Sequence, residues 1–158
     1  MAKAAKPVPE GYHTITPSLV LDHAASTIDW YKKALGAEEV SRSVGPDGKI
    51  MHAELKIGDS RFMMNDVMMG GKGPQTYGGS PASFWLYVQD SDALFNRAVA
   101  AGAKVQMPIT DQFWGDRAGA VSDPAGYSWW IATRKEDLTQ SEIQQRAAEF
   151  FKQMAPQH

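Results

Sequence analysis

The sequence repeats itself at a constant spacing, and this internal repeat limits the possible fold more than any other feature. An offset of 67 residues places apolar residues on apolar residues. The related positions are Leu19 and Leu86, Leu21 and Val88, Phe62 and Trp129, and Met64 and Ile131. Gly36 and Gly102, which end the helical patterns, are 66 apart and indicate one deletion within the second helix. The chain is therefore predicted to contain two copies of one structural unit.

Each copy is predicted to run strand, helix and three further strands, so that one helix covers one face of a small sheet. Strand formers lead up to Asp22, and apolar residues then recur at helical spacing as far as Gly36. Pro46-Asp47-Gly48 predicts a tight turn, because proline presets φ and glycine accepts a positive φ. The expected strands are 12–21, 37–45, 49–57 and 61–66, then 83–89, 103–110, 118–122 and 127–133, with the second helix over 91–101.

The fold class follows as α+β, with two βαβββ modules and a C-terminal amphipathic helix. The expected divisions are a flexible N-terminal segment 1–11, a single domain 12–134 of repeats 12–66 and 83–134 with the linker 67–82, and a helical extension 135–158. Thr139 and Glu142 have the spacing of a capping box at the start of that last helix. Its apolar stripe is expected to pack on its own domain or on a second subunit.

The composition excludes several classes of partner. The 158 residues carry a formal net charge of −2 and no block of basic residues, which argues against nucleic acid. The chain has no cysteine, which excludes disulfides and thiolate zinc sites and agrees with a cytoplasmic location. No apolar run approaches the ~18 residues of a membrane span, and no signal-peptide core follows the first lysines. We therefore expect a soluble, unprocessed cytoplasmic protein with no nucleic acid or membrane partner.

The predicted strands alternate between two kinds of face. Phe84, Leu86 and Val88 are apolar in one phase, as residues beneath a helix should be. The other phase is polar and aromatic and holds Ser83, Trp85 and Tyr87 in the second copy, and His52, Glu54 and Lys56 in the first. A mixed face of this kind is typical of the lining of a ligand cavity.

Four stretches resemble the vicinal oxygen chelate superfamily, which includes glyoxalase I, bleomycin-resistance proteins and extradiol dioxygenases. WYKKALGAEEV (30–40), PDGKIMHAELKIGDSRFMMND (46–66), MPITDQFWGDRAG (107–119) and SDPAGYSWWIATR (122–134) are similar to its PhnB-like, glyoxalase-like members. The resemblance covers roughly residues 12–134. It implies that two modules place curved sheets around a cleft, and that the protein is a homodimer.

The resemblance also implies where a metal would bind. Catalytic members of the superfamily hold one divalent ion with His, Gln or Glu at four positions. Carried over residue by residue, these positions fall on Thr16, Met63, Ser83 and Trp130. A hydroxyl is a poor neutral ligand, a thioether is soft, and an indole has no usable lone pair. We therefore expect no metal, no other cofactor, and a cleft that is aromatic and weakly polar.

The expected ligand is a small aromatic or hydrophobic molecule held by stacking on the aromatic lining. The residues expected to contact it are Trp85, Tyr87, Phe113, Trp114, Arg117, Trp130, Met63, His52 and Glu54. No catalytic residue is assigned. For the loop around Trp114, a structural lid in which Arg117 is ion-paired is an equally good interpretation.

Two other functions stay open. One is an enzyme of the same superfamily, of lyase, isomerase or dioxygenase type. It would use His52 and Glu54, with Asp66, as unconventional metal ligands, or it would be metal-free and use Asp116 or Arg117. The other is an assembly or regulatory protein whose cleft is vestigial.

Overall fold

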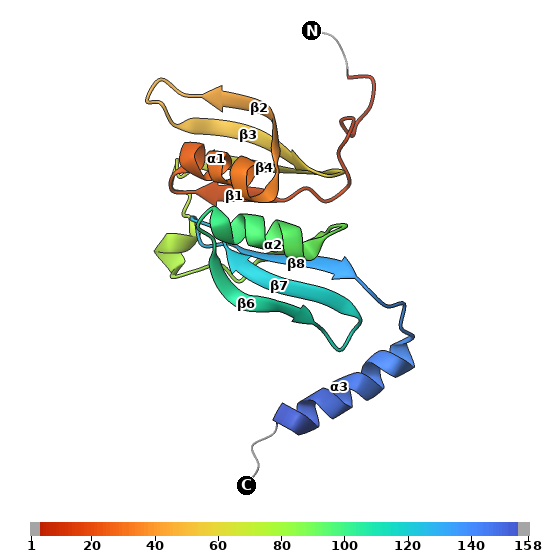
Figure 1. Ribbon diagram of the computed structural model, residues 1–158. Coiled ribbons are helices and arrows are strands. Elements are labelled where there is room, and N and C mark those ends of the chain that lie inside the picture. The colour runs from red at the N-terminus through yellow and green to blue at the C-terminus, as the bar shows by residue number, and fades with distance from the viewer. Residues whose placement is uncertain (1–3, 155–158) are drawn as a thin grey trace. The chain divides into compact units, whose positions relative to one another are not determined.

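The computed structural model describes residues 4–154, which form two compact units. One unit comprises the described residues up to Pro81 together with Asp123–Tyr127, and the other comprises Ala82–Ser122 and the described residues from Ser128 onward. Each unit has one four-stranded sheet, and one helix lies across a face of that sheet (Figure 1). These features confirm the α+β class with two βαβββ modules and a C-terminal helix.

The order of the elements is the same in both units. The first contains β1 (Ser18–Leu21), α1 (Ala24–Leu35), β2 (Glu38–Val44), β3 (Ile50–Ile57), β4 (Ser60–Asp66) and the short 3-10 helix η1 (Pro74–Tyr77). The second contains β5 (Ser83–Tyr87), α2 (Ser91–Ala100), β6 (Lys104–Asp111), β7 (Asp116–Ser122), β8 (Ser128–Arg134) and α3 (Gln140–Met154). The strand orders β1-β4-β3-β2 and β5-β8-β7-β6 are equivalent.

The pairing of the strands confirms the repeat of 67 residues. β1 pairs in parallel with β4, and β5 pairs in parallel with β8. Leu19 lies opposite Met64, and Leu86 lies opposite Ile131, so both partners move by the same offset. Leu19, Met64 and Ile131 are fully buried beneath the helices, as the alternation of the strands predicts.

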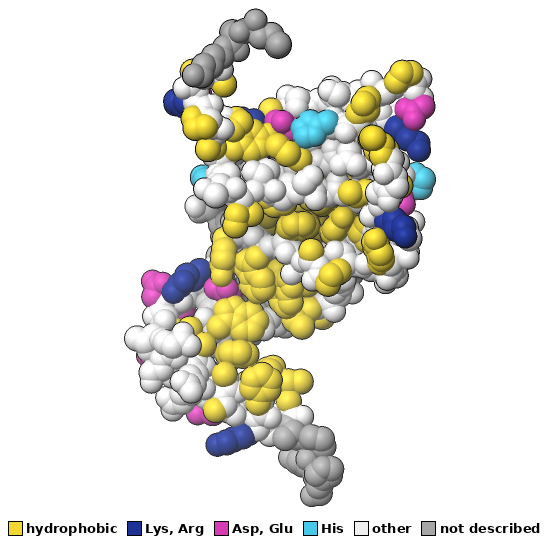
Figure 2. Space-filling view, turned by 180° about the vertical axis from the view of Figure 1, so that it is seen from behind, with side chains coloured by type: hydrophobic (Ala, Val, Ile, Leu, Met, Phe, Trp, Pro, Cys, Tyr) yellow, Lys and Arg dark blue, Asp and Glu magenta, His cyan; other side chains and the backbone are white. Residues whose placement is uncertain are grey.

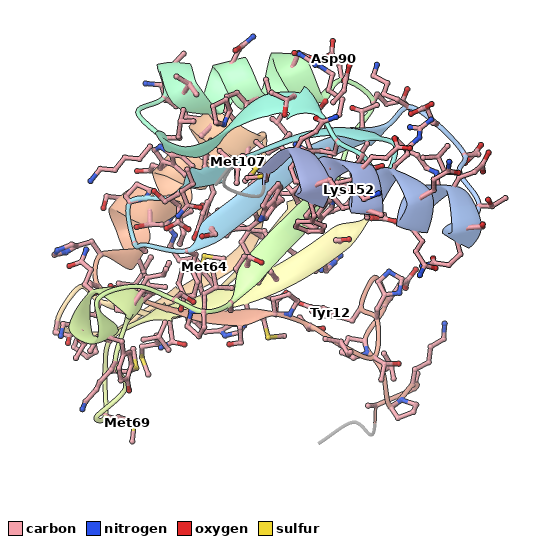
Figure 3. The ribbon with its side chains drawn as sticks, turned by 90° about the horizontal axis from the view of Figure 1, so that it is seen from below. Tyr12, Met64, Met69, Asp90, Met107 and Lys152 are labelled. Carbon is pink, nitrogen blue, oxygen red and sulfur yellow. The ribbon has the colours of Figure 1, made fainter. Side chains whose placement is uncertain are left out.

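A side chain at the end of the last strand receives the first N–H of each helix. Ala24 donates to Asp66 Oδ1 at 2.8 Å, and Ser91 donates to Thr133 Oγ1 at 2.8 Å. These two pairs are again related by the offset of the repeat. Asp90 also caps α2 with its own side chain and lies at the start of that helix (Figure 3). In contrast, the residue before α1 makes no side-chain cap, so α1 depends on Asp66.

Two segments differ from their predicted form. β1 begins at Ser18 instead of residue 12, because Pro17 has no N–H to donate to a ladder, although its carbonyl accepts from Met63 N at 2.8 Å. The glycine-rich segment 67–82 contains one short helical turn, η1. Met69 lies at the tip of this segment with a φ of 50° and a fully exposed side chain (Figure 3).

Gly119 allows β7 to approach its neighbours closely. A Cβ at this position would lie 2.8 Å from Phe95 Cε2 and 2.9 Å from the Cα of Ile109. Because the backbone of Ile109 cannot rotate away, we expect Gly119→Ala to lower the free energy of unfolding by about 1–3 kcal/mol. Urea denaturation measures the change, and an unaltered midpoint would show that the sheet relaxes around the methyl group.

Candidate functional site

The face of the second sheet that α2 does not cover is a continuous aromatic surface. It consists of Trp85 and Tyr87 from β5, Trp130 from β8, and Phe113 and Trp114 from the loop between β6 and β7; we call these five residues the aromatic face. The Trp85 and Trp130 rings are stacked, with centroids 4.7 Å apart and planes 9° apart. The ring centroid of Trp114 lies 6.2 Å from that of Trp85 and 5.0 Å from that of Phe113. Trp85 and Tyr87 are exposed, so flat ring surface is presented to solvent.

One buried carboxylate holds two of these side chains. Asp116 Oδ2 accepts hydrogen bonds from the Tyr87 hydroxyl at 2.9 Å and from Trp114 Nε1 at 3.0 Å. Asp116 is only 4% exposed. Burial and the neighbouring Asp116 carboxylate both raise the pKa of Tyr87, since ionisation would place two negative charges side by side. The aromatic face is therefore fixed from beneath by a charged residue.

The C-terminal helix extends this surface. The Phe113 ring centroid lies 5.3 Å from that of Phe150 and 6.3 Å from that of Phe151, both on α3. Figure 2 shows hydrophobic side chains continuing over this unit and along α3. No α3 residue is buried, and Phe151 is 63% exposed. No helix among residues 4–154 has the length and apolar character needed to cross a membrane.

The start of α3 is a capping box, as its sequence predicts. The Thr139 N–H donates to Glu142 Oε2 at 2.8 Å, and the Glu142 N–H donates to Thr139 Oγ1 at 3.3 Å. These contacts with Thr139 hold the pKa of Glu142 below its usual range. An ion pair between Arg146 and Glu136, at 2.6 Å, joins the helix to the segment before it.

Removal of residues 139–158 is expected to leave the remaining fold stable. Because no α3 residue is buried, we expect the Tm to fall by less than about 4 °C. A shift of that size corresponds to a change of roughly 1 kcal/mol in the free energy of unfolding. Differential scanning calorimetry measures this shift, and light scattering gives the mass before and after truncation. A much larger fall in Tm would contradict the exposed position of α3, and loss of a dimer with the helix would show that α3 packs on a second subunit.

Arg117 lies on the opposite face of its sheet from the aromatic rings. Its guanidinium donates to both oxygens of Asp92 at 2.6 and 2.8 Å, and to Asp111 at 3.1 Å. Residues alternate along β7, so Asp116 faces the rings while Arg117 faces α2. The structure does not bring Arg117 to the aromatic face. Its ion pairs with Asp92 and Asp111 are those expected if the loop around Trp114 is a structural lid.

A pocket of about 460 Å³ lies at the end of the second sheet where β6 ends and β7 begins. Its lining is charged and polar and consists of Asp111, Gln112, Gly115, Asp116, Arg117, Lys135 and Glu136. Asp116 thus belongs both to this pocket and to the support of the aromatic face.

The corresponding face of the first sheet is polar. His52 Nε2 lies 3.2 Å from Glu54 Oε1, and Arg61 lies 3.9 Å from the other oxygen of Glu54. The nearby Tyr12 hydroxyl lowers the pKa of Glu54 most, and His52 and Arg61 lower it further. The contact between Tyr12 and Glu54 does not have the geometry of a regular hydrogen bond. Met63 lies on this face, half-buried. The structure therefore brings His52 and Glu54 together as a pair.

The four residues that the resemblance assigns to the superfamily's metal positions have side chains poorly suited to a metal ion. Thr16 and Ser83 offer neutral hydroxyls, Met63 a thioether, and Trp130 an indole that is stacked on Trp85. Asp66 does not join His52 and Glu54, because both of its oxygens accept backbone N–H groups, from Ala24 and Ile50. Within residues 4–154, no group of three or more His, Asp or Glu side chains is arranged to hold a metal ion.

Some features of the site could not be predicted from the sequence. The buried hydrogen bonds of Asp116 to Tyr87 and Trp114 join residues up to 29 positions apart. The only advance signal was the grouping of Asp116 with aromatic residues in the stretch DQFWGDR. The contact of Phe113 with α3 was signalled only by the unpartnered apolar stripe of that helix.

Comparisons with known proteins agree with this fold. The model of the Glyoxalase/Bleomycin resistance protein/Dioxygenase superfamily matches residues 12–131. Mb0911c of Mycobacterium bovis is 46% identical over 135 residues, which cover 82% of this chain and 89% of that protein. The crystal structure of PA1353 from Pseudomonas aeruginosa matches with a TM-score of 0.64 and 28% identity, over 79% of this chain and all of PA1353.

A PhnB protein from Bacillus cereus has the same fold, with a TM-score of 0.60 and 20% identity over 77% of this chain and 99% of that protein. The family model spans both repeats, including the strands that carry Trp85 and Trp130. The resemblance read from the four sequence stretches is thereby confirmed. The chain belongs to the glyoxalase/bleomycin resistance protein/dioxygenase superfamily.

Proposed function

We propose that this protein binds a small aromatic or hydrophobic molecule on the aromatic face, without a bound divalent metal. The observation that carries the proposal is the exposed Trp85 ring, which is stacked on Trp130 and flanked by Tyr87 and Trp114. Exposed, fixed rings are suited to a flat ligand, because stacking adds about 0.5–1.5 kcal/mol per contact beyond the burial of apolar area. Soluble proteins rarely expose such a surface without a partner.

The residues at the metal positions support the metal-free part of the proposal. A thioether at Met63 and an indole at Trp130 are unsuited to Zn²⁺, Ni²⁺, Mg²⁺ or Fe²⁺. The chemistry of these side chains favours a binding protein over a metal-dependent member of the superfamily. A homodimer and a cytoplasmic location are part of the same proposal.

A catalytic role for His52 and Glu54 is the second candidate. Their contact at 3.2 Å is that of an imidazole oriented by a carboxylate, as in general acid–base sites. In this alternative Glu54 orients the imidazole ring of His52, and His52 transfers a proton to or from the substrate. Arg61 and Tyr12 lie beside Glu54 and keep its carboxylate ionised.

Metal analysis and calorimetry distinguish the two candidates. We expect purified protein to retain far less than one equivalent of Zn, Ni or Fe after dialysis, and to bind 1-naphthalenemethanol, an uncharged probe with a flat ring. Retention of one metal ion per chain, and its loss in His52→Ala, would favour the enzyme. Failure of this and other flat aromatic probes to bind would contradict the proposed function.

A further inference from the structure

Asp116 is a buried anion with an incomplete set of partners. Both of its hydrogen bonds, from Tyr87 and Trp114, are made to Oδ2 and come from neutral donors. No hydrogen bond to Oδ1 is made by the residues that the structure describes. A carboxylate that is 4% exposed normally requires a cationic partner or further donors, because the loss of its hydration is costly.

Two arginines near Asp116 are engaged elsewhere, and a third cationic side chain, Lys135, lines the same pocket as Asp116. Arg134 lies opposite Asp116 in the β7–β8 ladder, but its guanidinium pairs with Asp137 at 2.8 Å. Arg117 follows Asp116 in sequence, points to the other face and pairs with Asp92 and Asp111. Within the described part of the chain, Asp116 therefore forms no ion pair, and its negative charge stays beside the aromatic rings.

The surroundings of Asp116 favour a positively charged ligand group. The faces of tryptophan and tyrosine rings attract cations through the ring quadrupole, and four such rings lie on this surface. Asp116 also lines the polar pocket of about 460 Å³, which has room for a small head group.

We propose that the ligand carries a protonated amine, which Asp116 Oδ1 receives while the ligand's flat ring stacks on the aromatic face. This inference rests on the proposed function and narrows its ligand class. Asp116 would then have two roles: Oδ2 positions Tyr87 and Trp114, and Oδ1 selects the head group. A ligand with a carboxylate in the same place would be repelled by Asp116.

Three naphthalene probes that differ only in the head group test the proposal. They are 1-naphthylmethylamine, 1-naphthalenemethanol and 1-naphthoate, titrated calorimetrically into the wild-type protein at neutral pH and low salt. We expect the amine to bind at least about tenfold more tightly than the carboxylate, with the alcohol between them. Equal affinities for the three probes, or tighter binding of the carboxylate through Lys135, would overturn the inference but leave the proposed function intact. If none of the three binds, the proposed function fails as well.

Asp116→Asn tests the assignment to this residue. Asparagine has nearly the same volume and keeps an acceptor for Tyr87 and Trp114, so the rings should stay in place, which the near-ultraviolet circular dichroism checks. We expect the preference for the amine over the carboxylate to disappear, because the neutral amide neither attracts the ammonium group nor repels the carboxylate. Asp29→Asn, which removes an exposed carboxylate from α1, should leave all three affinities unchanged. If Asp116→Asn keeps the wild-type preference, Asp116 is not the selecting group. If it does not fold, the wild-type series alone decides the ligand class.

Discussion

Asp123→Ala is expected to lower the free energy of unfolding by about 3–4 kcal/mol, because it leaves several buried groups without partners. Asp123 Oδ2 accepts the hydroxyl proton of Tyr31 at 2.6 Å, and Tyr31 is completely buried. Oδ1 accepts the N–H groups of Ala125, Gly126 and Tyr127, at 2.8 to 3.0 Å. One carboxylate thus closes the turn after β7 and satisfies a core tyrosine of α1.

Urea denaturation with a common slope measures this change. Tyr31→Phe removes only one donor and should cost about 1–3 kcal/mol, less than the loss of the whole carboxylate. Tyr77→Phe is the matched control: its hydroxyl lies on an exposed side chain, so the expected change stays within about 0.5 kcal/mol. If Asp123→Ala were no more destabilising than Tyr77→Phe, the buried hydrogen bonds of this turn would be refuted.

Asp66→Ala is expected to lower the free energy of unfolding by about 2–4 kcal/mol, since two buried backbone N–H groups would lose their acceptors. Oδ1 accepts a hydrogen bond from the N–H of Ala24 at the start of α1. Oδ2 accepts one from the N–H of Ile50 at the start of β3, at 2.7 Å. Asp66 therefore joins a helix and two strands of the first sheet. Asp66→Asn retains one acceptor oxygen and should recover about half of the loss.

The internal repeat supplies a comparison for this variant. Thr133, the repeat mate of Asp66, receives Ser91 N and donates to Val88 O at 2.8 Å. Thr133→Val preserves the shape of the side chain and should cost about 1–2 kcal/mol, because α2 keeps its separate cap from Asp90. The account predicts a larger loss at Asp66 than at Thr133, measured by thermal and urea unfolding. The reverse order would contradict the dependence of α1 on Asp66.

The sequence predicted most of the fold because the repeat depends on backbone periodicity. Leu19, Leu86, Met64 and Ile131 occupy one of the two alternating phases of their short strands, and this phase is the helix-covered face. Gly36 has a positive φ of 69°, which a glycine at the end of a helix predicts. Such local rules operate within a few residues, so they can be applied without the tertiary structure.

Features set by tertiary contacts were harder to predict. The start of β1 depends on Pro17, whose missing N–H ends the ladder. The partners of Asp116 and Asp123 come from distant strands and from α1, and no spacing in the sequence connects them. Both carboxylates lie in loops or at strand ends, where backbone geometry follows packing more than propensity.

The candidate site was predictable in part for the same reason. Trp85, Tyr87 and Trp130 share a face because strands alternate, and the sequence already placed them together. Arg117 was grouped with them because it follows Trp114 closely in sequence, yet its strand turns it toward α2 and Asp92. The asymmetry between the aromatic second sheet and the polar first sheet, with His52 and Glu54, is visible in both sequence and structure.

The most direct test of the central claim is a calorimetric titration of 1-naphthalenemethanol into Trp130→Ala. Trp130 supports the exposed Trp85 ring at 4.7 Å, so its removal should weaken binding at least about tenfold while the protein stays folded. Trp30→Phe, in α1 of the first unit, is the control and should bind as the wild type does. Wild-type affinity in Trp130→Ala would contradict the claim that the aromatic face of the second sheet is the ligand site.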